Sequence, residues 1–443
     1  TDTSTAQTVT VVISGTNDAP VVSGVVSDVN VVEDSSVSVL DALVNASDVD
    51  NGHVLSVVNV PGSLPAGVSY NAANHTFTLD PGNAAYQHLA VGQTTVVTAN
   101  YGVSDGIAPT PTAASVSWTI TGTNDAPTVS GAVTAAVAED ASVSTLDALA
   151  NASDVDDGAS LSVVNVPTTL PAGVTYDAVH HTFTLDPGNA AYQHLAAGQT
   201  TVVTVNYGVT DGIVTVPTAA SVSWTITGTN DAPTVSAALT DTANEGDAAF
   251  TRNLLTHASD VDDGDTLSVA NVSYTVDGGS ASGTPPAGIS LSGSTLNIDP
   301  AHPSFDHLAF GQSTKIQVSY DVKDLLGLLV HQTETITING TNDAPTVAGP
   351  LTDAANEGDA AFSRNLLTGA ADVDDGDILS VVNVTYKVGM GAASSIAPSG
   401  ISLTGSTLSI DPTDSSFDHL GAGQHTTIEV SYDVKDTLGL LIH

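Results

Sequence analysis

The chain has 443 residues, of which 48 are Asp or Glu and only 6 are Lys or Arg, giving a formal net charge of −42. This charge excludes a nucleic-acid partner, because nucleic-acid affinity rests on Lys and Arg side chains that neutralise phosphates. There is no cysteine and no run of about 18 apolar residues, so the sequence predicts neither disulfides nor a membrane span.

The hexapeptide Gly-Thr-Asn-Asp-Ala-Pro divides the chain. It starts at Gly15, Gly122, Gly228 and Gly340, at spacings of 107, 106 and 112 residues. Asn and Asp supply oxygen ligands or turn hydrogen bonds, and the proline stiffens the exit of the chain, so we interpret each copy as a joint. We predict four repeats at 15–121, 122–227, 228–339 and 340–443. Residues 1–14 are predicted to be the last strand of a preceding repeat, or a donor strand, because 7–13 align with 332–338.

Short runs of alternating apolar and polar residues recur within each repeat, between Gly, Pro, Asn and Asp. Examples are 161–166, 181–185 and 201–207. Six or seven such strands in about 100 residues are typical of an immunoglobulin-like sandwich. Repeats three and four have a longer hairpin, at 274–286 and 386–398, which is either a contact surface or neutral loop variation.

Three acidic features recur in register besides the joint. The first is a Glu about sixteen residues after the joint. The second is an Asp-Val-Asp turn that ends in Gly, and the third is an Asp after a Tyr-x-Val strand. Hard cations such as calcium take about six to eight oxygen ligands, so the clusters predict calcium sites. A single such turn is more often a solvated loop, and the His residues are too scattered for zinc. The spacing does not fit an EF-hand, so the ligands must come from distant parts of the sequence.

These motifs resemble those of cadherin-like domains, and 120–127 (ITGTNDAP) resembles the signature of bacterial VCBS repeats. The resemblance covers the whole chain. It implies an elongated rod of four Greek-key β-sandwiches that is not an enzyme and that lies outside the cell. VCBS repeats occur in long RTX adhesins and biofilm proteins exported by type I secretion, so a bacterial cell surface is expected. The expected partners are neighbouring repeats of the same or an identical chain, together with a cell-surface or matrix ligand.

The resemblance also implies Ca²⁺ sites between repeats, each with the Glu of one repeat, the joint, and the two Asp features of the next. The ligands of the first joint would be Glu33, Asn124, Asp125, Asp154, Asp156 and Asp211. Those of the second would be Glu139, Asn230, Asp231, Asp260, Asp262 and Asp324. Those of the third would be Glu245, Asn342, Asp343, Asp372, Asp374 and Asp436. A partial site would remain at Asn17, Asp18, Asp48, Asp50 and Asp105. The chain lacks the Leu-Asp-Arg-Glu motif of animal cadherins, so the number of ions per joint stays open.

Other signals in the sequence favour structural roles. Residues 102–106 match a nucleophile-elbow pattern, but the second repeat has Thr210 at the Ser position, so only the Asp recurs. We interpret the His before Leu in each repeat (His88, His194, His307, His419) as a structural turn residue. Trp118 and Trp224 lie on alternating strands and are predicted to be core residues.

The fourth repeat stops at a position that aligns with His331, and this predicts that it lacks its last strand. One explanation is that the chain is part of a longer one. The alternative is a filament in which residues 7–14 of one copy add to the open repeat of another. A carbohydrate-binding or hydrolase accessory module is a further alternative.

Overall fold

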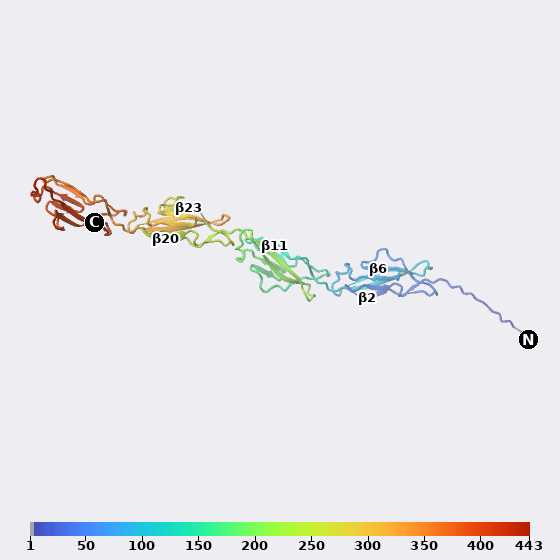
Figure 1. Ribbon diagram of the computed structural model, residues 1–443. Coiled ribbons are helices and arrows are strands. Elements are labelled where there is room, and N and C mark those ends of the chain that lie inside the picture. The colour runs from blue at the N-terminus through green and yellow to red at the C-terminus, as the bar shows by residue number, and fades with distance from the viewer. Residues whose placement is uncertain (1–3) are drawn as a thin grey trace. The chain divides into compact units, whose positions relative to one another are not determined.

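The computed structural model describes residues 4–443, and every helix or strand assigned among them is a β-strand. The prediction of tandem all-β domains is therefore confirmed. Residues 1–3 of the predicted segment 1–14 lie outside the described residues. Within 4–443 no helix could cross a membrane. The chain divides between Thr229 and Asn230 into two compact units, which are described separately (Figure 1).

The first unit contains the first two repeats. Strands of the first repeat are β1 (Val21–Val22), β2 (Val26–Val32), β3 (Ser38–Asp41), β4 (Ala46–Ser47), β5 (Ser56–Val58), β6 (Val68–Asn71), β7 (Thr76–Leu79), β8 (Thr94–Ser104) and β9 (Thr112–Thr121). Strands of the second are β10 (Thr128–Val129), β11 (Val133–Ala138), β12 (Ser144–Asp147), β13 (Ala152–Ser153), β14 (Ser162–Val164), β15 (Val174–Asp177), β16 (Thr182–Leu185), β17 (Thr200–Thr210) and β18 (Thr218–Thr227). Residues 4–20, which include the predicted strand at 7–13, form no strand.

Each of these repeats has one four-stranded and one three-stranded sheet. The orders in the first repeat are β2-β9-β8-β5 and β3-β7-β6, and β1 pairs with β4. Strand β2 runs parallel to β9, whereas β8 pairs antiparallel with both β9 and β5. The second repeat has the same topology. The last strand of each repeat therefore lies inside a sheet, between the first and the penultimate long strands.

The core lies between the two sheets. In the first repeat, Phe77 on β7 packs against Tyr101 on β8 with ring centroids 5.2 Å apart, and both belong to one cluster of buried side chains. Trp118 and its counterpart Trp224 are 0% exposed, so both are core residues as predicted. The alternation of β9 explains this, because every second residue faces the other sheet.

The second unit contains the last two repeats. Strands of the third repeat are β19 (Thr234–Val235), β20 (Leu239–Asn244), β21 (Phe250–Asn253), β22 (Ala258–Ser259), β23 (Ser268–Val276), β24 (Ile289–Ser292), β25 (Thr295–Ile298), β26 (Ser313–Lys323) and β27 (Leu329–Asn339). Strands of the fourth are β28 (Thr346–Val347), β29 (Phe362–Asn365), β30 (Ala370–Ala371), β31 (Ser380–Val388), β32 (Ile401–Thr404), β33 (Thr407–Ile410), β34 (Ile428–Lys435) and β35 (Leu441–Ile442). Among residues 4–443, all sheets form within single predicted repeats, but the boundaries of the repeats stay predictions.

The fourth repeat differs from the third around its last strand. Strand β27 spans eleven residues between β20 and β26, whereas β35 has two residues that pair with the end of β34. Residues 351–356, the counterpart of β20, form no strand. Because β20 pairs only with β27, the first strand depends on the last one.

A buried acid distinguishes the third repeat. Glu334 on β27 is 0% exposed and lies close to Asp241. Asp241 forms an ion pair with Arg252. Burial is the main cause that raises the pKa of Glu334 to about 7, and the charge of Asp241 adds to it. The folded repeat therefore favours the protonated acid.

We predict that the third repeat loses stability as the pH rises through 7. In the folded state Glu334 keeps its proton at pH values at which an unfolded Glu, with a pKa of 4.5, has lost it. The stability that protonated Glu334 contributes to the fold is therefore present at low pH and is lost as the pH rises above the folded pKa. The expected loss between pH 5 and pH 8 is about 1–3 kcal/mol. Hydrogen exchange of β27, corrected for intrinsic rates, measures it.

Glu334→Gln should reduce this dependence because the amide does not titrate, and the part that remains belongs to Glu245 of the same repeat, whose pKa burial also raises to about 7. The second repeat is an internal control, since Val222 occupies the matching position on β18. Equal pH dependence in Glu334→Gln and the parent chain would contradict the prediction.

Candidate metal centres

The Asp-Val-Asp turns orient one carboxylate in the same way in every repeat. Oδ1 of the first Asp accepts the backbone N–H of the second, at 2.8 Å between Asp50 and Asp48 and at 3.0 Å in the other turns. Its other oxygen is buried and meets no hydrogen-bond donor among the described residues. This holds for Oδ2 of Asp48, Asp154, Asp260 and Asp372. A buried carboxylate oxygen without a donor is unfavourable, so its recurrence indicates a place for a cation.

The second Asp of each turn is tied to the joint. One of its oxygens accepts the backbone N–H of the joint aspartate. The pairs are Asp18 with Asp50 at 2.8 Å, and Asp125 with Asp156, Asp231 with Asp262 and Asp343 with Asp374 at 3.0 Å. Oδ1 of Asp156, Asp262 and Asp374 is again buried without a donor in the described part of the chain.

The strand-end aspartate of each repeat is bonded to the joint. In each repeat the joint Asn donates its side-chain N–H to this Asp. The distances are 2.9 Å for Asn17 to Asp105, 2.7 Å for Asn124 to Asp211, 2.6 Å for Asn230 to Asp324 and 2.7 Å for Asn342 to Asp436. The backbone N–H groups of Ala108 and Ile107, followed by Asn17, lower the pKa of Asp105 to about 2. This carboxylate is therefore negative at any physiological pH.

At the first joint, Glu33 faces the acidic groups of the next repeat. Its carboxylate is 2% exposed and accepts the backbone N–H of Thr123 at 3.0 Å. Burial raises the pKa of Glu33, and the nearby charges of Asp125 and Asp156 raise it further. Burial also raises the pKa of Asp125, and the charges of Asp156 and Asp154 add to this increase. Asn124 donates to Asp211 and to the backbone carbonyl of Asp125, which links Asp211 to the other residues predicted for this joint, and their role as ligands of one ion stays a prediction.

The third joint has the same arrangement within the second unit. Glu245 is 6% exposed, and burial together with the charge of Asp343 raises its pKa to about 7. Burial raises the pKa of Asp374, and Asp372 and Asp343 add to the effect. Oε2 of Glu245 is buried without a donor among residues 4–443. Glu245 and Asp374 therefore both resist ionisation, and a divalent cation would stabilise their charged forms.

The residues predicted for the second joint belong to both units. In the first unit, Glu139 is fully buried and accepts the backbone N–H of Thr229 at 2.7 Å. In the second unit, Asn230 and Asp231 contact Asp324 and Asp262 as described above. The combination of these two halves into one site stays a prediction.

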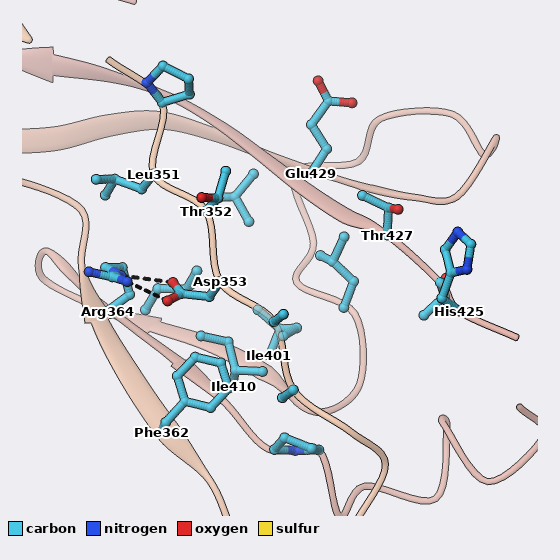
Figure 2. Close-up of a pocket in the computed structure, with 18 of the residues that line it drawn as sticks. Leu351, Thr352, Asp353, Phe362, Arg364, Ile401, Ile410, His425, Thr427 and Glu429 are labelled. Atoms are coloured by element: carbon cyan, nitrogen blue, oxygen red, sulfur yellow. Dashed lines mark hydrogen bonds and ion pairs between the residues drawn. The ribbon is translucent and has the colours of Figure 1, made fainter. Parts of the chain in front are cut away.

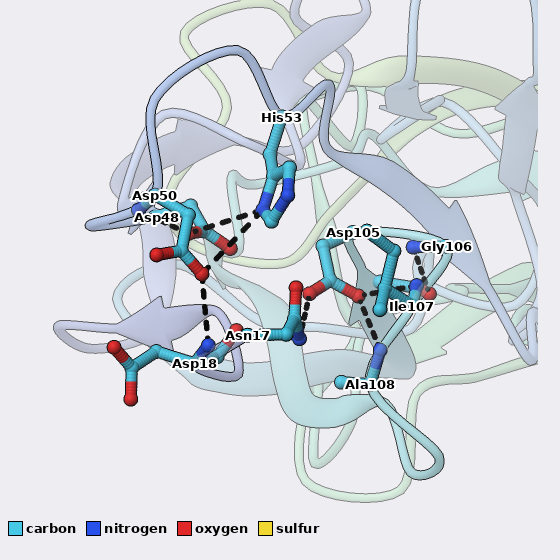
Figure 3. A network of polar contacts seen from close by, with 10 residues as sticks. Asn17, Asp18, Asp48, Asp50, His53, Asp105, Gly106, Ile107 and Ala108 are labelled. Atoms are coloured by element: carbon cyan, nitrogen blue, oxygen red, sulfur yellow. Dashed lines mark hydrogen bonds and ion pairs between the residues drawn. The ribbon is translucent and has the colours of Figure 1, made fainter. Parts of the chain in front are cut away.

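The partial site of the first repeat contains a histidine that was not predicted as a ligand (Figure 3). Asp48, His53 and Asp105 bring one ligand atom each to within 4.8 Å of one another. Asp18 contributes its backbone N–H to Asp50, while its carboxylate points away from the other acidic groups.

The position directly after the turn glycine was not predicted to be a ligand. In the third repeat Asp265 groups with Asp260 and Asp324, and in the fourth Asp377 groups with Asp372 and Asp374. Oδ1 of Asp265 accepts the backbone N–H of Leu325 at 3.0 Å. An acid at this position in two of four repeats was the signal that could have revealed it.

Two of the recurring histidines, His88 and His307, contact the acidic turn of the next repeat through their backbone carbonyls. The carbonyl of His88 accepts the backbone N–H of Asp157 at 2.8 Å, and the carbonyl of His307 accepts that of Asp375 at 2.9 Å. The side chain of His88 is half-exposed, 3.9 Å from the carboxylate of Asp157. In both units, this turn therefore touches the acidic turn of the following repeat.

Comparisons with known proteins find one matching family model, in the second repeat. Residues 123–227 match the model of the cadherin-like domain family. No curated protein matches the chain. Among solved structures, the extracellular cadherin domains 1–4 of protocadherin gamma B7 are similar at 15% identity, with a TM-score of 0.43, covering 95% of this chain and 100% of that one. Mouse cadherin-23 EC22-24 is similar at 16% identity, with a TM-score of 0.42, covering 73% and 99%. The second repeat is thus a match to a cadherin-like domain.

Proposed function

We propose that this chain is a calcium-stiffened extension region of a secreted bacterial surface adhesin or biofilm matrix protein. The observation that carries the calcium part is the recurrent buried carboxylate oxygen without a donor on the first turn aspartate, which groups with further possible ligands in the first, third and fourth repeats. Oxygen ligands from carboxylates, in the absence of Cys, suit a hard cation. The bacterial and extracellular parts rest on the resemblance of residues 120–127 to VCBS repeats.

The role of the ion would be mechanical. At the first joint, Glu33 belongs to one repeat and Asp154 and Asp156 to the next, so a shared cation would resist bending between them. Without the ion, the same carboxylates repel each other. We propose that the region extends or scaffolds an adhesin and has no catalytic role. Trp118 and Trp224 are wholly buried, so neither offers a face to a sugar ring, which weighs against the carbohydrate-binding alternative.

We predict that Asp154→Asn changes the stability of the first unit in opposite directions with and without calcium. In chelator, the variant should be about 1 kcal/mol more stable, because a buried charge without a donor is removed. When the calcium concentration exceeds a typical extracellular dissociation constant by tenfold to a hundredfold, each occupied site adds about 1.4–2.7 kcal/mol to the free energy of unfolding. The variant should lose this stabilisation at one joint. Denaturation followed by tryptophan fluorescence measures both, since the only two tryptophans, Trp118 and Trp224, lie in the first unit.

The matched control is Asp186→Asn, an exposed acid in the same repeat. It should leave both stabilities unchanged. Calcium stabilisation that is equal in Asp154→Asn and the parent chain would contradict the assignment of this ligand. Small-angle scattering with calcium and then with chelator tests the stiffening itself, and an unchanged maximum dimension and flexibility would refute it.

A second role, strand acceptance by the fourth repeat, is favoured by a groove of about 1150 Å³ along β34 (Figure 2). Leu351, Ile401, Ile410 and Val430 line it. In the third repeat, Ile298 and Val318 correspond to Ile410 and Val430 and are 0% exposed, whereas Ile410 and Val430 are half-buried. The groove thus corresponds to the place that β27 fills in the third repeat.

Residues 7–14 have the pattern that this groove accepts. In β27 the inward residues are Gln332, Glu334, Ile336 and Ile338, and the aligned residues are Gln7, Val9, Val11 and Ile13. The three apolar ones are 76–90% exposed. The groove keeps the ion pair of Arg364 with Asp353, and Val9 in place of Glu334 would add no further buried carboxylate there. We propose that residues 7–14 of a second copy add to the fourth repeat as a strand.

This role predicts concentration-dependent, head-to-tail association that requires inward apolar residues of the donor. Light scattering should show oligomers for the parent chain and monomers after deletion of residues 1–14. Val11→Asp should abolish association, because it would place a carboxylate in an apolar groove. Val12→Asp changes an outward-facing residue and should associate like the parent. Monomers for the parent chain at all concentrations would overturn the proposal.

A further inference from the structure

The residue directly after the turn glycine differs among the four repeats. It is His53, Ala159, Asp265 and Asp377 in chain order. In the third and fourth repeats it adds a carboxylate to an all-oxygen group. In the second it adds nothing. Only in the first does it bring an aromatic nitrogen to the group.

The imidazole of His53 faces the acidic turn (Figure 3). Its Nδ1 lies 3.5 Å from Oδ1 of Asp48 and 3.9 Å from Oδ2 of Asp50. Both distances are too long for hydrogen bonds. One atom each from Asp48, His53 and Asp105 lie within 4.8 Å of one another, which is close enough for all three to reach one ion.

Two of these side chains have buried atoms that meet no hydrogen-bond partner in the described part of the chain. They are Oδ2 of Asp48, whose side chain is 5% exposed, and Nδ1 of His53, whose side chain is 19% exposed. Both residues come from the same turn. Asp105 is fixed separately by the backbone N–H groups of Ile107 and Ala108 at 2.9 and 2.8 Å. The site is therefore built from two segments that are far apart in sequence.

We propose that Asp48, His53 and Asp105 bind a borderline divalent metal ion of the zinc class. Calcium is bound by oxygen ligands, whereas Zn²⁺ and its neighbours accept neutral imidazole nitrogen together with carboxylates. Three protein ligands and a water complete the usual coordination of about four. The inference goes beyond the proposed calcium function and changes the metal expected at this end of the first repeat.

An alternative role for His53 is purely electrostatic. A protonated imidazole between Asp48 and Asp50 would offset their charge without any metal. The two roles differ in one measurable respect, because only the metal site selects an ion that calcium does not displace.

The experiment is titration of the full chain with ZnCl₂ in buffer that contains millimolar Ca²⁺, with Co²⁺ absorption as a spectroscopic probe of nitrogen ligation. The parent chain should bind one Zn²⁺ more tightly than any other. His53→Ala should weaken this binding at least about tenfold and remove the corresponding Co²⁺ band. His53→Asp, which copies Asp265, should also lose Zn²⁺ but bind Ca²⁺ in its place.

Two further variants separate this site from other zinc binding. His180→Ala removes an exposed histidine that pairs with Asp177 alone and should leave the tight site intact. Ala159→His should add a second Zn²⁺ per chain, because Asp154 and Asp211 already occupy the matching positions. The proposal is overturned if His53→Ala and His53→Asp bind Zn²⁺ as the parent does, or if the parent shows no site tighter than its background. Neither result affects the outcome expected for Asp154→Asn, so the zinc and calcium proposals are tested independently.

Discussion

The repeated constraint in this protein is the burial of carboxylates whose oxygens meet no donor. Two like charges about 4 Å apart cost about 4 kcal/mol at an effective dielectric constant near 20, so such groups do not gather without a compensating partner. Here the same oxygen of the first turn aspartate is left without a donor in all four repeats. The surrounding backbone bonds hold these oxygens in place, and residues 1–251 contain no Lys or Arg. A divalent cation is the simplest way to satisfy them.

The sandwich positions these groups by means of its longest strands. Strand β8 ends at Ser104, directly before Asp105, and β9 ends directly before the joint. The bond from Glu33 to the backbone of Thr123 then ties the acid that follows β2 to the joint that follows β9. Because β2 and β9 are parallel neighbours, Glu33 and Thr123 lie at the same end of the sheet. The pairing that completes the core therefore also brings Glu33 to the following joint.

Repetition made much of this predictable. The alternation of apolar and polar residues predicted the strands, and it predicted that Trp118 and Trp224 are buried. Because the acidic features recur in register in four repeats, they could be distinguished from turns that are acidic by chance. What could not be predicted depends on partners distant in sequence. Residues 351–356 closely resemble the sequence of β20, yet form no strand, because the parallel partner is absent beside them in the described chain. The contribution of Asp265 and Asp377 was missed because their position varies among the repeats.

That variable position also explains how one fold can hold different sites. The residue after the turn glycine contributes to the acidic end but not to the sandwich core, so it can change without a loss of packing. The first and second repeats have identical residues across long stretches of β8, β9, β17 and β18, yet they differ here as His53 and Ala159. Aspartate at this position adds an oxygen, histidine adds a nitrogen, and alanine removes a ligand. In the proposed sites, the scaffold would thus fix where a cation lies, while a single side chain would set which kind of cation fits.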